Sequence, residues 1–115
     1  MGFELFKSSF VQVRAKVYRT SLLFPKKTLE LLNCKYVNVY FDKENKLMAL
    51  EPTENIENAF AIAKDRITST DLADTIRTIT NVYDCILNGH SDSDKKMIIF
   101  DLKNIKETDK WILQS

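Results

Sequence analysis

The residues best suited to chemistry in this sequence are basic side chains near its start, and their chemistry is phosphate binding. Arg14 and Lys16 are two positions apart in a segment that alternates apolar and polar residues, so they share one strand face. A row of such cations binds nucleic-acid phosphates in a salt-dependent way, and an interleaved tyrosine can stack on a base or sugar. The alternative interpretation is an ordinary solvated strand face. The predicted nucleic-acid-binding residues are Arg14, Lys16, Tyr18, Arg19, Lys26 and Lys27.

Residues that support catalysis or metal binding are sparse. The only histidine is His90, and the two cysteines, Cys34 and Cys85, are far apart, which excludes the paired ligand spacing of a zinc site. Asp92 and Asp94 lack the rest of a calcium-loop pattern, and no glycine-rich phosphate loop or nucleophile elbow is present. We therefore expect no enzyme activity, no cofactor and no metal.

A protein-binding surface is the alternative function. Tyr36 and Tyr40 are predicted on the polar side of their strand, opposite Val37 and Val39, and exposed tyrosines are common in interfaces. Acidic residues dominate the chain after position 35, where they could dock a basic partner. Tyr36 and Tyr40 are thus the predicted protein-interaction residues of a small interaction module, such as a phage-type inhibitor of a host or defence protein.

Length and composition predict one folded domain over residues 1–115. The chain is 44% hydrophobic with two glycines and two prolines, so most residues should lie in strands or helices. Residues 1–35 hold seven basic and two acidic residues (+5), and the remainder holds ten basic and fourteen acidic residues (−4). Unpaired cysteines in apolar contexts fit a reducing, cytoplasmic setting, and no apolar run is long enough for a membrane span.

The elements that must position these residues follow from periodicity. Strands are expected over 10–19, 36–41, 47–50, 82–87 and 97–102, and a strand or a helical turn over 59–63. Pro25 begins a short helix that ends at Asn33, and the Thr68–Asp71 cluster caps a second helix carrying Leu72, Ile76 and Ile79. Polar turns are expected over 42–46 and 88–94. Residues 103–115 form a polar tail.

The strand, helix, hairpin order occurs twice, over 10–52 and 59–102. Leu29 and Leu32 match Ile76 and Ile79 with an offset of 47, and Val39 matches Cys85 with an offset of 46. Two such units can cover each other's apolar faces, which predicts an α+β domain with a small β-barrel or a curved sheet. Coincidence is the competing explanation, because strand-helix-hairpin is a common order.

Two short motifs connect the first unit with a known family. Phe24-Pro25-Lys26 before the helix and Leu50-Glu51-Pro52 at the end of the hairpin resemble the swapped-hairpin domain of AbrB/SpoVT-type regulators and related antitoxins, over about residues 16–52. This chain has Lys35-Tyr36 where that family has Gly-Asp, and its second unit has Thr70-Asp71 in place of Pro-Lys. The resemblance implies a single-chain pseudo-dimer with one diverged half.

The resemblance also implies DNA binding through basic side chains on the strand and loop before the first helix, which are Arg14, Lys16, Arg19, Lys26 and Lys27 in this chain. We therefore expect a small non-enzymatic DNA-binding protein: a transcriptional regulator, or an accessory factor of a phage or plasmid. Only one half of the pseudo-dimer is basic, so pairing of two chains into a homodimer would strengthen DNA binding.

Overall fold

The computed structural model describes residues 10–82, 84–92, 96–103 and 105. Most of the predicted tail over 103–115 lies outside these residues. The elements, in chain order, are β1 (Phe10–Val17), β2 (Ser21–Leu23), α1 (Lys26–Leu32), β3 (Tyr36–Asp42), β4 (Leu47–Thr53), β5 (Phe60–Ala61), β6 (Arg66–Thr68), α2 (Thr70–Thr80), β7 (Cys85–Asp92) and β8 (Met97–Asp101).

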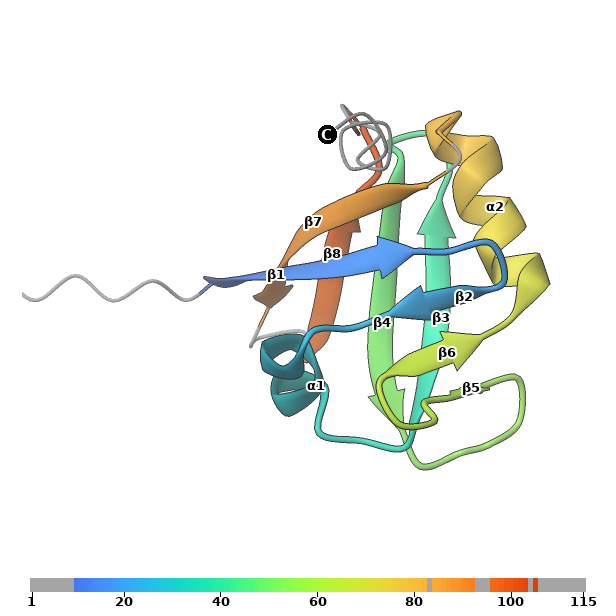
Figure 1. The fold of residues 1–115 in the computed structure, drawn as a ribbon. Helices are drawn as coiled ribbons and strands as arrows, with labels where there is room; N and C mark the ends of the chain where they lie inside the picture. The colour runs from blue at the N-terminus through green and yellow to red at the C-terminus, as the bar shows by residue number, and fades with distance from the viewer. Residues whose placement is uncertain (1–9, 83, 93–95, 104, 106–115) are drawn as a thin grey trace, which may run out of the picture.

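All eight strands belong to one antiparallel sheet with the order β5-β3-β4-β8-β7-β1-β2-β6. The two ends of this order approach each other through a bridge between Ala63 and Arg66, whose backbone N–H groups each donate to the other's carbonyl, at 2.9 and 3.2 Å. The sheet therefore curls into a nearly closed barrel (Figure 1). The expectation of an α+β domain built on a small barrel or curved sheet is confirmed.

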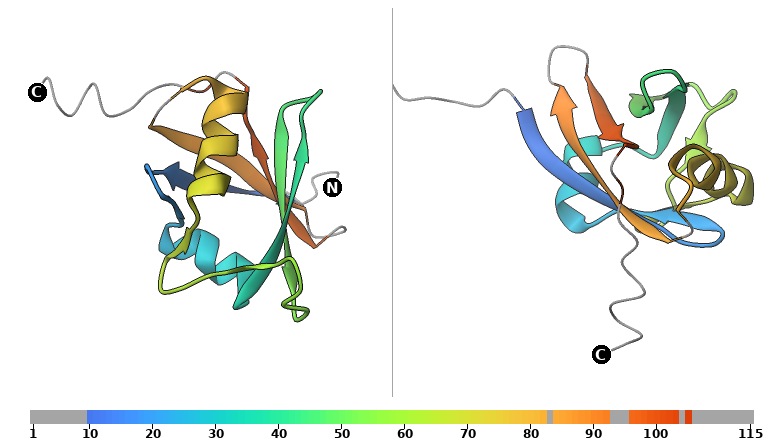
Figure 2. Two further views of the ribbon diagram at one scale, coloured as in Figure 1. Left: turned by 90° about the vertical axis from the view of Figure 1, so that its right-hand side faces the viewer. Right: turned by 90° about the horizontal axis from the view of Figure 1, so that it is seen from above.

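The core fills the inside of this barrel. Val13, Ala15 and Val17 alternate inward along β1, as predicted, and are buried. Met48 and Leu50 on β4 face Phe100 and Ile98 on β8, and all four are buried. Figure 2 shows α1 and α2 on opposite sides of the barrel, so neither helix covers the outer surface of β1 and β2.

Both helices begin as predicted, and the first ends as predicted. Pro25 precedes α1, and Asn33 ends it in the left-handed conformation (φ 43°). The Ser69 hydroxyl accepts the backbone N–H of Leu72 at 3.1 Å to cap α2, and Asn81 ends that helix with φ 58°. Asn tolerates the left-handed region, so it replaces the glycine that commonly stops helices.

The predicted turn over 88–94 is wrong for residues 88–92, which continue β7. These residues have strong turn-forming types, but they pair with β1 on one side and β8 on the other. Gly89 permits this, because a Cβ there would lie 2.3 Å from the Ile99 carbonyl oxygen and 2.8 Å from Phe100 Cδ1. The segment over 59–63 also differs: only Phe60–Ala61 forms a strand, β5.

Replacement of Gly89 by alanine should destabilise the fold, since β8 and the Phe100 ring must move to admit the methyl group. We expect the free energy of unfolding in urea to fall by about 1–3 kcal/mol. Asn88→Ala, at the neighbouring outward position of β7, is the matched control and should change it by less than about 0.5 kcal/mol. Equal effects of the two substitutions would contradict the close approach of β7 and β8.

Cys85 is fully buried beside Val17, and burial raises the pKa of its thiol to about 11. Cys34 is half-buried, and burial raises the pKa of its thiol as well. In native protein near pH 8 we expect iodoacetamide to label Cys34 slowly and Cys85 only after unfolding. Because the Cys85 thiol ionises near pH 9 in the unfolded chain but only near 11 in the fold, the free energy of unfolding should fall as pH rises from 9 toward 11. Mass spectrometry measures the labelling of each thiol. Equal labelling of both thiols in native protein would refute this arrangement.

Candidate nucleic-acid interface

The sheet registers place a row of outward side chains across four strands. Lys16 on β1 pairs with Ile86 on β7 and with Leu23 on β2, and Leu23 pairs with Arg66 on β6. The neighbouring pairs, Val17 with Leu22 and Leu22 with Ile67, point into the core. We call the outward surface of β7, β1, β2 and β6 the basic face; Arg14, Lys16 and Arg66 supply its charges.

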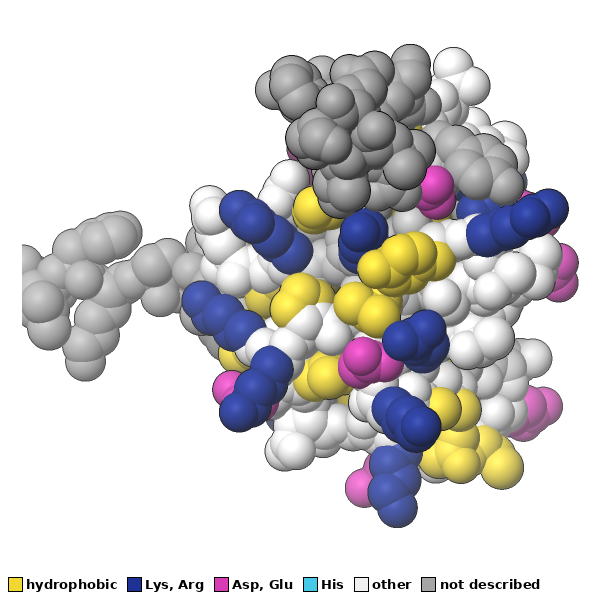
Figure 3. Space-filling view, in the orientation of Figure 1, with side chains coloured by type: hydrophobic (Ala, Val, Ile, Leu, Met, Phe, Trp, Pro, Cys, Tyr) yellow, Lys and Arg dark blue, Asp and Glu magenta, His cyan; other side chains and the backbone are white. Residues whose placement is uncertain are grey.

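The view of this face shows what surrounds those charges. Lys and Arg side chains are spread over it, with apolar side chains between them and few acidic ones (Figure 3). One acid, Asp65, is beside Arg66, with 3.0 Å between Oδ1 and Nε. That contact is solvent-exposed, and exposed pairs of this kind contribute little binding energy. The face therefore combines positive charge with apolar surface.

Arg14, Lys16 and Tyr18 lie as the alternation of β1 predicts. Arg14 is exposed, Lys16 is half-buried, and Tyr18 is 36% exposed just beyond the strand. The Lys16 ammonium lies 5.0 Å from the centre of the Tyr18 ring, which is a cation–π distance. The tyrosine ring thus lies directly beside one of the phosphate-binding candidates.

Arg19 lies in the turn between β1 and β2, and α2 holds that turn in place. The Arg77 guanidinium donates to the carbonyl oxygens of Tyr18 at 3.1 Å and Arg19 at 3.0 Å, and also bonds the Asp74 carboxylate. Arg77 and Arg66 were both missed by the sequence analysis. The partners of both residues are distant in the sequence: Arg77 bonds Tyr18, 59 positions away, and Arg66 pairs with Leu23. No local pattern therefore indicates their positions.

Lys26 and Lys27 are exposed in the first turn of α1, and a buried threonine fixes that helix against β1. The Thr28 hydroxyl donates to the Arg14 carbonyl at 2.8 Å and is almost inaccessible to solvent. Lys27 consequently lies over the same hollow as Arg14, whereas Lys26 does not line it. Neither Arg14 nor Lys27 forms an ion pair with any residue that the structure describes.

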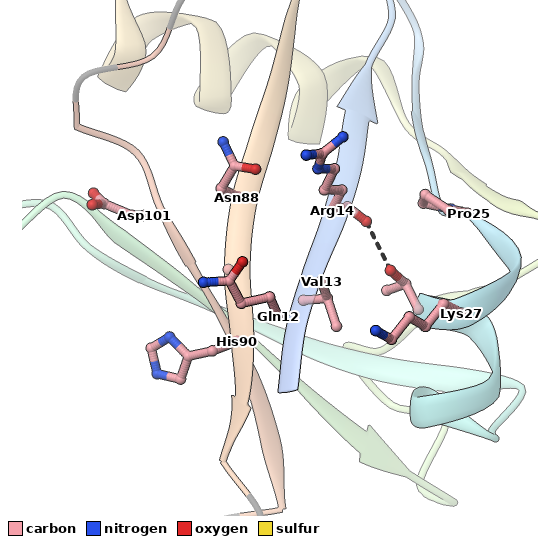
Figure 4. A pocket seen from close by; sticks show the side chains of 10 residues that line it. Gln12, Val13, Arg14, Pro25, Lys27, Asn88, His90 and Asp101 are labelled. Carbon is pink, nitrogen blue, oxygen red and sulfur yellow. Dashed lines mark hydrogen bonds between the residues drawn. The ribbon is translucent and has the colours of Figure 1, made fainter. Parts of the chain in front are cut away.

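The hollow beside the basic face is a cavity of about 620 Å³, lined in part by Gln12, Arg14, Lys27, Asn88, His90 and Asp101. The strand pairing brings these lining residues together. Arg14, Asn88 and Asp101 are neighbours across β1, β7 and β8, and Gln12 pairs with His90 two residues further along β1 and β7. Figure 4 shows Arg14 and Lys27 on one side and Asp101 on the other.

The two predicted interaction tyrosines lie elsewhere, on β3. The Tyr40 ring is 49% exposed and its hydroxyl donates to Glu51 Oε1 at 3.0 Å, a bond that raises the Tyr40 pKa. The Asn38 amide donates to the same carboxylate oxygen at 3.3 Å. Tyr36 is only half-buried, at the start of the strand. The structure therefore does not bring these tyrosines to the basic face.

Among the described residues, no group of three or more His, Cys, Asp and Glu side chains is placed to hold a metal ion. In the same part of the chain, neither helix has the length and apolar character needed to cross a membrane. No protein-family model, curated protein or solved structure matches the chain.

Thr28→Val should weaken the attachment of α1 to β1, because it leaves the Arg14 carbonyl without its buried partner. We expect the free energy of unfolding in urea to fall by about 1–2 kcal/mol. Thr78→Val makes the same chemical change on α2, where an exposed hydroxyl bonds the Asp74 carbonyl at 2.9 Å, and should have a smaller effect. A loss at Thr28 no larger than that at Thr78 would show that the hydroxyl does not hold the helix.

Proposed function

We propose that the protein is a small non-enzymatic DNA-binding protein, a transcriptional regulator or an accessory factor of a phage or plasmid, that binds through the basic face. The observation that carries this proposal is the uncovered row from Ile86 through Lys16 and Leu23 to Arg66, flanked by Arg14. The proposal keeps Arg14, Lys16, Tyr18, Arg19, Lys26 and Lys27 as contacts and adds Arg66.

The chemistry of the face suits a nucleic-acid backbone. Lys16 and Arg66 are separated by two strand spacings, or about 10 Å, so they contact different phosphates of one strand or of two. Tyr18 and the apolar side chains between the cations offer surface for sugars and bases. The chain's net charge of only +1 means that affinity depends on this one face, and hence on salt concentration.

The proposal includes a swapped-hairpin pseudo-dimer like that of the AbrB/SpoVT-type family. Three facts of topology support it. The β3–β4 hairpin of the first half lies between β5 and β8 of the second, and the β7–β8 hairpin lies between β4 and β1 of the first. Exchanging the halves leaves the strand order unchanged once the bridge between Ala63 and Arg66 closes the ring. Each half thus inserts its hairpin into the other.

The strand registers also suggest how the two halves correspond. Leu22 pairs with Ile67 and Ala49 with Ile99, as expected where a local two-fold axis crosses the sheet. The contact of Tyr18 with Ser21 corresponds to that of Ala63 with Arg66, an offset of 45 before the helices. The pair of Val39 with Leu50 corresponds to that of Gly89 with Phe100, an offset of 50 after them, which matches Val37 with Leu87. This offset of 50 takes the place of the offset of 46 by which the sequence pattern matched Val39 with Cys85. The change in offset is consistent with α2 having 11 residues and α1 having seven.

Protein binding is the second candidate function, favoured by exposed apolar surface away from the basic face. Ile56, in the connection between β4 and β5, is 65% exposed, and Tyr40 on the neighbouring β3 is 49% exposed. A partner protein, or a second copy of this chain, would bury these side chains. Binding through Tyr36 and Tyr40 stays a prediction of this second function.

DNA binding is tested by fluorescence polarisation with a short labelled duplex and with one of its strands. We expect affinity that falls steeply between roughly 50 and 200 mM salt. Arg14→Ala combined with Lys16→Ala should weaken binding and reduce the steepness of the log–log salt dependence by about 2, because two phosphate contacts are lost.

The matched control is Lys43→Ala combined with Lys103→Ala. This pair removes the same charge from exposed positions in the β3–β4 turn and after β8, outside the basic face. It should leave the salt dependence nearly unchanged. If the control matches the Arg14 and Lys16 variant, the basic face is not the binding surface. If neither DNA form binds at low salt, DNA binding itself is refuted.

A further inference from the structure

The cavity beside the basic face differs from the rest of that face in its chemistry. Cations line one side, with Arg14 on β1 and Lys27 on α1 (Figure 4). The opposite side carries a carboxylate, Asp101 on β8, and an amide, Asn88 on β7, lies between them. A simple anion would be attracted to the side lined by Arg14 and Lys27 and repelled by the Asp101 carboxylate. The cavity is therefore polarised from positive to negative across three strands.

The dimensions of the cavity exceed those of a phosphate ion. Its volume of about 620 Å³ lies within the range of roughly 300–1,000 Å³ that is usual for small-molecule sites. Arg14 and Asp101 both pair with Asn88, from opposite sides of β7, so they are two strand spacings, or about 10 Å, apart. A ligand that contacts both must carry an anionic group at one end and a hydrogen-bond donor at the other.

We propose that this cavity binds one nucleotide, with its phosphate on the side lined by Arg14 and Lys27 and its base toward Asn88 and Asp101. The Asn88 amide can both donate to and accept from a base edge, and a carboxylate accepts from an exocyclic amino group. Asp101 therefore favours adenine or cytosine over thymine. The His90 ring, one row along from Asn88 and beside Gln12, supplies a planar surface on which the base stacks.

The position of the cavity connects this inference to the basic face. Arg14 belongs to both, and the Thr28 bond to its carbonyl holds Lys27 over the same hollow. A strand whose phosphates follow Lys16 and Arg14 leads directly to the cavity. The nucleotide is either a free mononucleotide or one unit of a bound strand, and the second source rests on the proposed DNA-binding function.

The single histidine of the sequence gives a direct test, because its ring resonances belong to His90 without further assignment. At constant pH and ionic strength, titration with dAMP or dCMP should shift these signals saturably, and dTMP should bind about tenfold more weakly. Inorganic phosphate alone should bind more weakly than either. Asp101→Asn should remove the preference over dTMP, whereas Asp71→Asn, an equal charge change on exposed α2, should preserve it.

The outcomes separate this inference from the proposed function. If phosphate binds as tightly as the nucleotides, or if no nucleotide shifts the His90 signals, the nucleotide site is refuted, even when the polarisation assay shows salt-dependent DNA binding. If mononucleotides bind with the expected preference but no oligonucleotide does, the site stands for a free nucleotide and the DNA-binding function fails. A single-stranded oligonucleotide that shifts the same signals at lower concentration supports both.

Discussion

The eight-residue pairing of β1 with β7 is the interaction on which the rest of the structure depends. It runs from Phe10 with Asp92 to Val17 with Cys85, so it joins two segments that lie about 75 positions apart in the sequence. Without it the curled sheet would be split between β7 and β1 into two pieces, each with an open edge and an exposed apolar face. Such a long-range ladder forms only when its inward side chains are buried together, which here requires Gly89 to admit Phe100.

The same ladder determines both the core and the candidate site. Because side chains alternate along a strand, burying Val13 and Ala15 forces Arg14 and Lys16 to the outside. Across the ladder, the neighbours of Arg14 and Gln12 are Asn88 and His90, two residues of the segment that sequence alone assigns to a turn. A shift of the register by one residue would place the cations in the core, so the stability of the barrel protects the arrangement of the surface.

The two halves have similar element orders but different surfaces. The first half contributes Arg14, Lys16 and Lys27, and the second contributes Arg66, Asn88 and Asp101. Since each hairpin lies between strands of the other half, residues that are distant in the sequence become neighbours on one face. In our proposals the first half supplies most of the phosphate contacts, while the second supplies the groups that distinguish one base from another.

The sequence by itself determined the local features of this protein. Alternation placed Arg14 and Lys16 on the outside of β1, Ser69 capped α2, and Asn33 ended α1, since each depends on residues within one turn or one strand. Only the tertiary structure decided that Asn88–Asp92 is a strand, that Arg66 joins the row of Lys16, and that Asn88 and Asp101 line one cavity with Arg14 and Lys27. The physical reason is that these contacts are set by pairing between distant strands, whose register follows from burying both inward faces together and leaves no local pattern in the chain.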